Sequence, residues 1–271
     1  AGMFEERTLA EQTMENSEKV EELPSVNPEN SRVVPRAVSD VRSSGSVSYP
    51  QHNLGPSDIV RAEDGSLVWS YGIQPKNIRN RLSNNQRGML HADMTKMEDA
   101  EIRAIDDRKF VYGQNHFLQR GVMWQLKKTD YIAQYRDDPL EFVHEGDVYM
   151  AFPKTTHQWH LAPVPHTTPT WGGVALVHED GTIDHLSPEE AQESEILDGQ
   201  RIYPLYNSAE KAKSLSYRGG IFNQFREFGQ LEDVVVPSEI PDSAENSQPF
   251  VIDLEGEQMV YSYAMGPPRD N

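Results

Sequence analysis

Residues 64–71 read DGSLVWSY, and the same kind of segment returns as EGDVYMAF at residues 145–152 and as EGEQMVYSY at residues 255–263. Each begins with an acidic residue and a glycine, a pair that tolerates the positive φ of a tight hairpin turn. Each then continues into an apolar, aromatic-rich stretch typical of a strand. A shorter apolar stretch precedes each turn, at residues 58–60, 140–143 and 249–252. The sequence therefore predicts a β-hairpin that occurs three times.

Further elements are expected around these hairpins. Residues 88–92 (GMLHA) match residues 173–177 (GVALV) and predict a return strand after the first two hairpins. Helical patterns precede the second and third hairpins, as RGVMWQ at residues 120–125 and RGGIFN at residues 218–223, and a short helix is expected within residues 32–49. In the helix before the second hairpin, one face is expected to contain Phe117, Gly121, Trp124, Tyr131 and Tyr135.

These patterns predict an α+β fold of repeated units, each with one helix packed on a small antiparallel β-sheet. The third unit is expected to be incomplete, because the sequence stops at Asn271 before a return strand. The expected divisions are a polar acidic N-terminal tail (1–31), a first unit (32–110), a second unit (111–198) and a third, truncated unit (199–271). The tail holds eight glutamates against two basic residues, a composition that predicts disorder unless it lies on the body or on a partner.

Charge and composition restrict the possible partners. The formal net charge of −18 disfavours binding to nucleic acid and to anionic membranes, and it suits basic partners or cations. Residues 179–199 hold eight acidic residues and no basic one, whereas residues 76–136 hold twelve basic residues against seven acidic ones. Such blocks can pair within one chain or between copies. The absence of cysteine excludes disulfides and thiolate sites.

The segment around residues 157–171 carries the candidate binding residues. We expect a recognition surface there, built from Trp159, Trp171, His157, His160 and His166. An alternative is a zinc or copper site formed by the three histidines. The surrounding prolines predict a polar loop between two strands, and only a loop would bring histidines three residues apart together, because a strand points them to opposite faces. No other cofactor is predicted.

Catalytic motifs are not found in the sequence. It contains no Gly-x-Ser-x-Gly elbow, no phosphate-binding loop ending in Gly-Lys-Ser/Thr and no dinucleotide fingerprint. The adjacent carboxylate pairs do not suit an acid/base dyad, since neighbouring side chains rarely face one another. Ser187 followed by Pro188 and Glu190 instead predicts a capped helix start. No catalytic residue is assigned, and binding is favoured over catalysis.

A resemblance supports this interpretation. The segment GGVALVHEDGTI at residues 172–183 and the downstream RIYP at residues 201–204 resemble tandem PepSY-like or cystatin-like modules. These occur in the extracytoplasmic part of bacterial membrane proteins of unassigned function. The resemblance covers about residues 50–268 and implies a non-catalytic domain that is extracytoplasmic or membrane-associated. It is a pattern of strands and turns, without a catalytic motif.

We therefore expect an interaction or scaffold module, either an extracytoplasmic domain or an accessory subunit of a larger assembly. The expected contact is a protein partner, or a second copy, at an exposed sheet edge left by the incomplete unit. No apolar run is long enough to span a bilayer, so membrane association would require a partner or an absent anchor. Two alternatives are a histidine-loop metal protein or metal-dependent enzyme, and a virion or cell-surface structural protein.

Overall fold

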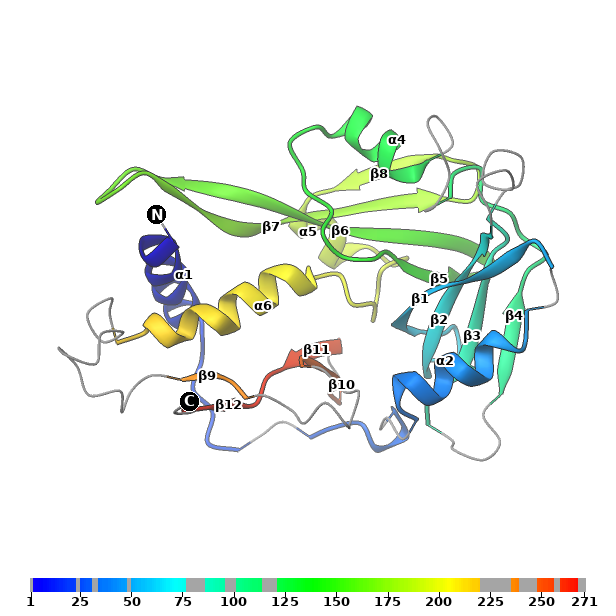
Figure 1. Cartoon of the computed structure of the whole chain (residues 1–271), viewed down its shortest axis with the longest axis horizontal. Coiled ribbons are helices and arrows are strands. Elements are labelled where there is room, and N and C mark those ends of the chain that lie inside the picture. Colours follow the sequence, from blue (N-terminus) through cyan, green and yellow to red (C-terminus); the bar gives the residue numbers. More distant parts are fainter. Residues whose placement is uncertain are drawn as a thin grey trace.

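The computed structural model describes residues 2–22, 25–30, 34–47, 50–76, 86–95, 101–113, 121–219, 235–238, 248–255 and 259–267 (Figure 1). Within these residues the fold is α+β, as the sequence predicts, and every sheet is antiparallel. The helices are α1 (Gly2–Glu15), α2 (Arg36–Ser44), α4 (Val122–Thr129), α5 (Pro188–Glu193) and α6 (Leu205–Ser214), with 3-10 turns at Pro28–Asn30 and Leu215–Tyr217. No described helix has the length and apolar character needed to cross a membrane.

The first four-stranded sheet has the order β1-β2-β3-β4. Its strands are β1 (His52–Arg61), β2 (Leu67–Pro75), β3 (Met89–Asp93) and β4 (Ile102–Ile105). In the turn between β1 and β2, Gly65 has φ +84°. The Ser66 amide donates to Asp64 Oδ1 at 3.0 Å in the same turn. The predicted acidic-glycine turn is therefore present.

The second four-stranded sheet has the order β5-β6-β7-β8. Its strands are β5 (Leu140–His144), β6 (Asp147–His160), β7 (His166–His178) and β8 (Ile183–Leu186). Glu145 and Gly146 connect β5 to β6 with φ values of 51° and 82°. Two consecutive positive φ values define the tight turn whose twist matches a hairpin.

The two sheets also agree in register. Trp69 lies opposite Ala92 in the first sheet, and Met150 lies opposite Val177 in the second. Gly88 comes just before β3 and has φ +46°, whereas Gly173 lies within β7, at the register irregularity opposite Pro153–Thr155, and has φ +90°. A Cβ at Gly88 would collide with the Ile105 carbonyl oxygen, and one at Gly173 would collide with that of Leu186. The neighbouring strand therefore requires glycine at both places.

A helix packs on each of these sheets. On the first sheet, the Tyr71 hydroxyl donates to Ser39 Oγ in α2 at 2.9 Å. On the second sheet, Val122 and Leu126 of α4 are fully buried against Phe152. The sheets also contact each other, because Val68 of β2 packs with Phe142 of β5 in a shared apolar cluster. The main core thus lies between the sheets and beneath the helices.

The prediction that Trp124 and Tyr131 share the packed face of the helix before the second hairpin is wrong. Trp124 is 57% exposed and Tyr131 is 89% exposed. The helix ends at Thr129, so the helical spacing does not continue to Tyr131. The buried positions are instead Val122 and Leu126, four residues apart on one face. Phe117, like residues 220–223 of the other predicted helix, lies outside the described residues.

The acidic N-terminal segment also differs from the prediction of disorder, because residues 2–15 form α1. Leu9 and Ala10 are buried, at 2% and 0% exposure. Arg7 Nη1 donates to the Tyr217 carbonyl oxygen at 3.0 Å, and Lys213 Nζ in α6 lies 3.2 Å from Glu6 Oε1. The segment is ordered because it lies on the body, where packing supplies the stability that its composition lacks.

The predicted loop around the histidines is largely strand. β6 continues through Pro153 to His160, and β7 starts at His166 and continues through Pro169. Both prolines lie beyond the residues where β5 and β8 pair, so each has a neighbouring strand on one side only within these sheets. The result is a long hairpin that projects past α1 (Figure 1). Only residues 161–165 remain as a loop.

The C-terminal part contributes two smaller sheets. β10 (Phe250–Asp253) pairs with β11 (Met259–Ser262), and β9 (Val236–Pro237) pairs with β12 (Met265–Gly266). Met259 packs with Ile59 and Trp69 of the first sheet. The turn residues 256–258 lie outside the described residues.

Candidate functional site

The tip of the β6–β7 hairpin exposes apolar side chains. Trp159 is 72% exposed, Leu161 is 79% exposed and Val164 is 38% exposed. Trp159 lies opposite Thr167 near the end of the ladder, and Leu161 and Val164 belong to the loop that follows. Large apolar groups clustered on a projecting tip are typical of a contact surface.

Two of the predicted histidines meet on one face of this hairpin. His160 lies opposite His166, and their rings stack with centroids 5.0 Å apart. His166 Nδ1 donates to the Val164 carbonyl oxygen at 2.7 Å, so in the neutral ring Nε2 accepts from the Thr8 hydroxyl at 2.8 Å. His160 Nε2 bonds Thr168 Oγ1 at 2.8 Å. Hydroxyl and carbonyl partners thus hold both rings in place.

The other predicted site residues lie elsewhere. His157 is opposite Pro169 and points to the face away from His160, since the two are three residues apart along one strand. Trp171 donates from Nε1 to the Gly173 carbonyl oxygen at 3.0 Å, and its ring packs 5.9 Å from that of Tyr203. Trp171 therefore belongs to the body, whereas Trp159 belongs to the tip. In the part of the chain that the structure describes, no group of three or more histidine or acidic side chains is arranged to hold a metal ion. The histidine metal site remains a hypothesis.

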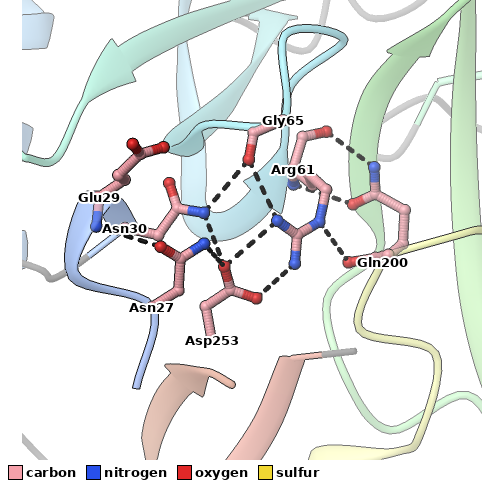
Figure 2. Close-up of polar contacts among 8 residues, drawn as sticks. Asn27, Glu29, Asn30, Arg61, Gly65, Gln200 and Asp253 are labelled. Carbon is pink, nitrogen blue, oxygen red and sulfur yellow. Dashed lines mark hydrogen bonds and ion pairs between the residues drawn. The ribbon is translucent and has the colours of Figure 1, made fainter. Parts of the chain in front are cut away.

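A polar junction that the sequence did not predict joins the ends of β1 and β10 (Figure 2). Arg61, at the end of β1, donates from Nη2 to Asp253 Oδ1 at 2.5 Å and from Nη1 to Asp253 Oδ2 at 3.3 Å. Its guanidinium also donates from Nη1 to the Gly65 carbonyl oxygen at 3.1 Å and from Nε to that of Gly199 at 3.2 Å. Each guanidinium nitrogen therefore has a partner.

Asp253 also binds two residues of the N-terminal segment, Asn27 and Asn30. Asn30 Nδ2 donates to Asp253 Oδ2 at 2.6 Å, and Asn27 Nδ2 donates to it at 3.3 Å. Gln200 joins from the opposite side, accepting from the Arg61 amide at 3.0 Å and donating to the Arg61 carbonyl oxygen at 2.7 Å (Figure 2). Burial raises the pKa of Asp253, but the hydrogen bonds from Arg61 and Asn30 outweigh it and keep the pKa below its usual value.

The two charged residues of the junction occupy corresponding places in their hairpins. Arg61 pairs with Leu67, the first residue of β2, and Asp253 pairs with Met259, the first residue of β11. The connections, residues 62–66 and 254–258, are equal in length. The first hairpin and the C-terminal hairpin therefore touch through equivalent positions that carry opposite charge.

A second buried ion pair lies nearby. Arg201, 9% exposed, contacts Asp58 of β1, whose side chain is 19% exposed. Arg201 Nη1 also donates to the Tyr261 hydroxyl at 3.0 Å, and that hydroxyl donates to the Tyr203 carbonyl oxygen at 3.0 Å. Burial raises the pKa of Asp58 to about 6, even though Arg201 opposes the shift. This cluster attaches β11 to the first sheet.

The sequence contains one signal that points to the junction. Arg61 and Asp253 each stand at the end of the strand that precedes an acidic-glycine turn. That shared place marks them as equivalent, but nothing local indicates that they pair. Comparison with known proteins offers no further guidance, because no family profile, curated protein or solved structure matches this chain.

Proposed function

We propose that the chain is an interaction and scaffold module, acting as an extracytoplasmic domain or accessory subunit of a larger membrane-associated or multi-subunit assembly. The observation that carries the proposal is the unequal size of the sheets. Two sheets have four strands, whereas β10 and β11 pair only with each other among the named strands of the described residues. A short sheet leaves backbone groups available to a partner strand.

The proposal includes repetition of one unit. The matching order and register of the two large sheets support it, as does the helix packed on each. α6 and the β10–β11 hairpin correspond to the start of a third unit, since the Ser208 hydroxyl in α6 donates to the Tyr263 hydroxyl just after β11 at 3.1 Å. In this scheme a partner supplies the third strand of the unit. That strand would pair with β11 as β3 pairs with β2 and β7 pairs with β6.

The backbone indicates where such a strand would bind. The Asp253 carbonyl oxygen accepts from the Asn27 amide at 2.9 Å, so it points away from β11. Backbone N–H and C=O groups alternate in direction along an antiparallel pair, so those of Val251 point away from β11, like those of Asp253. The backbone groups of Tyr261, which pairs with Val251, therefore point away from β10. The N–H and C=O of Tyr261 are therefore the groups that an added strand would bind.

Native mass spectrometry of the protein purified from its source tests this proposal. We expect a defined complex, with a second protein or a second copy. Amide exchange followed by NMR should then show that the Tyr261 amide exchanges more slowly in the complex than in the dissociated chain. The Val260 amide, which faces β10, is the matched control and should change little. A monodisperse monomer whose Tyr261 amide is already protected would refute the proposal.

A further inference from the structure

The β6–β7 hairpin differs in charge from the rest of the chain. No aspartate, glutamate, lysine or arginine occurs from Thr155 to His178, although the whole chain carries a formal charge of −18. This uncharged segment includes the whole projecting part of the hairpin (Figure 1). Its tip exposes Trp159 and Leu161, at 72% and 79%.

The polar groups of this hairpin are largely bonded to one another. Backbone pairing is continuous from Thr155 opposite Trp171 to His160 opposite His166. Thr156 and Thr170 share a hydrogen bond of 2.9 Å across the strands. The stacked histidines are bonded to Thr168, Thr8 and the Val164 carbonyl oxygen. The paired strands thus have many of their polar groups bonded within the protein, which lowers the cost of leaving water. The loop at residues 161–165 lies outside this ladder, so its backbone groups stay at the level of water and headgroups.

We propose that this hairpin tip inserts into the interfacial region of a lipid bilayer with uncharged, zwitterionic headgroups. Tryptophan favours that region because its ring is apolar and its indole N–H still reaches water or headgroups. Leu161 and Val164, in the loop that forms the tip, supply the apolar surface that enters the acyl boundary. The surface is separate from the β11 edge, so the inference goes beyond the protein partner proposed above.

The shape of the tip favours a bilayer over a protein pocket. Trp159 at the end of β6 and Leu161 and Val164 in the loop after it lie at the end of the projecting hairpin, and none of them lines the described cavities of the molecule. A projecting, uncharged tip can enter a bilayer without a matching cavity, whereas a protein partner would have to supply one.

Charge selects among lipids. Gln12 of α1 donates to Gln158 at 3.3 Å, so α1 lies beside the hairpin. Glu11 of that helix is paired with Arg7 at 2.6 Å, but the exposed Glu15 and the chain's net charge of −18 would be repelled by anionic headgroups. Binding should therefore be stronger to phosphatidylcholine vesicles than to vesicles that also contain phosphatidylserine.

The test uses the full chain with phosphatidylcholine vesicles, by flotation and by quenching of tryptophan fluorescence with brominated lipid. The double variant Trp159→Ser with Leu161→Ser should partition about a hundredfold more weakly than the wild type, since both lost groups enter the bilayer. Trp124→Ser is the matched control, because Trp124 is 57% exposed on α4 and outside the tip. This control should bind as the wild type does.

Three results would overturn the inference: no binding of the wild type to phosphatidylcholine vesicles, equal binding by the tip variant, or binding only to phosphatidylserine vesicles. Circular dichroism of the tip variant checks that it folds, which is expected because the substituted side chains are exposed. If the vesicles fail and the tip variant instead loses a protein from the native complex, the tip is a protein contact. Native mass spectrometry of the same variant keeps this inference distinct from the β11 edge, which the substitutions leave intact.

Discussion

Replacing Asp253 by alanine should destabilise the fold substantially. The Asp253 side chain is 2% exposed, and it accepts hydrogen bonds from Arg61, Asn27 and Asn30. Its removal leaves the Arg61 guanidinium, whose side chain is 19% exposed, without a counter-charge. Breaking a buried ion pair from one side costs about 3–5 kcal/mol. Since Arg61 keeps its bonds to the carbonyl oxygens of Gly65 and Gly199, we expect about 3 kcal/mol.

Urea unfolding followed by circular dichroism measures this loss. Asp253→Asn keeps an acceptor oxygen and should lose only about 1–2 kcal/mol. Asp198→Ala removes an exposed carboxylate near Gly199 and should change the free energy of unfolding by less than about 0.5 kcal/mol. Combining Arg61→Met with Asp253→Leu should cost less than the two single changes added together, because no charge is left buried and unpaired. A loss below about 1 kcal/mol for Asp253→Ala would refute the assignment of the junction as a main attachment of the C-terminal hairpin.

Two other predictions concern the ion pair of Asp58 with Arg201 and the glycine at position 173 within β7. The fold raises the pKa of Asp58 to about 6, so it favours the protonated carboxyl. The stability gained from protonated Asp58 is fully present below the ordinary pKa of 3.8, and it is lost as the pH rises through 6. Asp58→Asn should therefore remove a decline in unfolding free energy of up to about 3 kcal/mol between pH 4 and 6, and an unchanged pH profile in urea titrations would count against the burial argument. Gly173→Ala should lower thermal stability by more than about 1–2 kcal/mol, because Gly173 has φ +90° and its Cβ would collide with the Leu186 carbonyl oxygen. The control Gly45→Ala, whose Cβ would lie 3.8 Å from the nearest atom, should melt close to the wild type, and equal melting of the two variants would contradict the steric argument.

The local features of the fold follow from the sequence. Acidic-glycine pairs predict turns because positive φ is a property of a few residue types, and Gly65 and Gly146 adopt it. The helix cap at Ser187 is equally local, and the structure contains the full capping box with Glu190. Such signals need only neighbours in the chain, which is why they are readable without a structure.

The features that the sequence did not predict depend on distant contacts. α1 is a helix because Leu9 and Ala10 are buried against the body. The acidic composition of the segment does not indicate that contact. The hairpin extends through Pro153 and Pro169 because no neighbouring strand of the sheet needs their missing amides. For the candidate site, the sequence grouped Trp159, Trp171 and three histidines, whereas the structure stacks only His160 on His166 and packs Trp171 on the body.

The junction of Arg61 with Asp253 has a consequence for assembly. The contact joins two hairpins through equivalent positions, and those positions carry unlike charges. If two first hairpins met in this way, two guanidinium groups would face each other, and two C-terminal hairpins would oppose two carboxylates. The charges therefore favour pairing of a first hairpin with a C-terminal hairpin, and they disfavour pairing of two identical hairpins. The C-terminal hairpin of one molecule would nevertheless fit the first hairpin of another with every bond retained, which makes exchange of this hairpin the route by which two copies would join without a new interface.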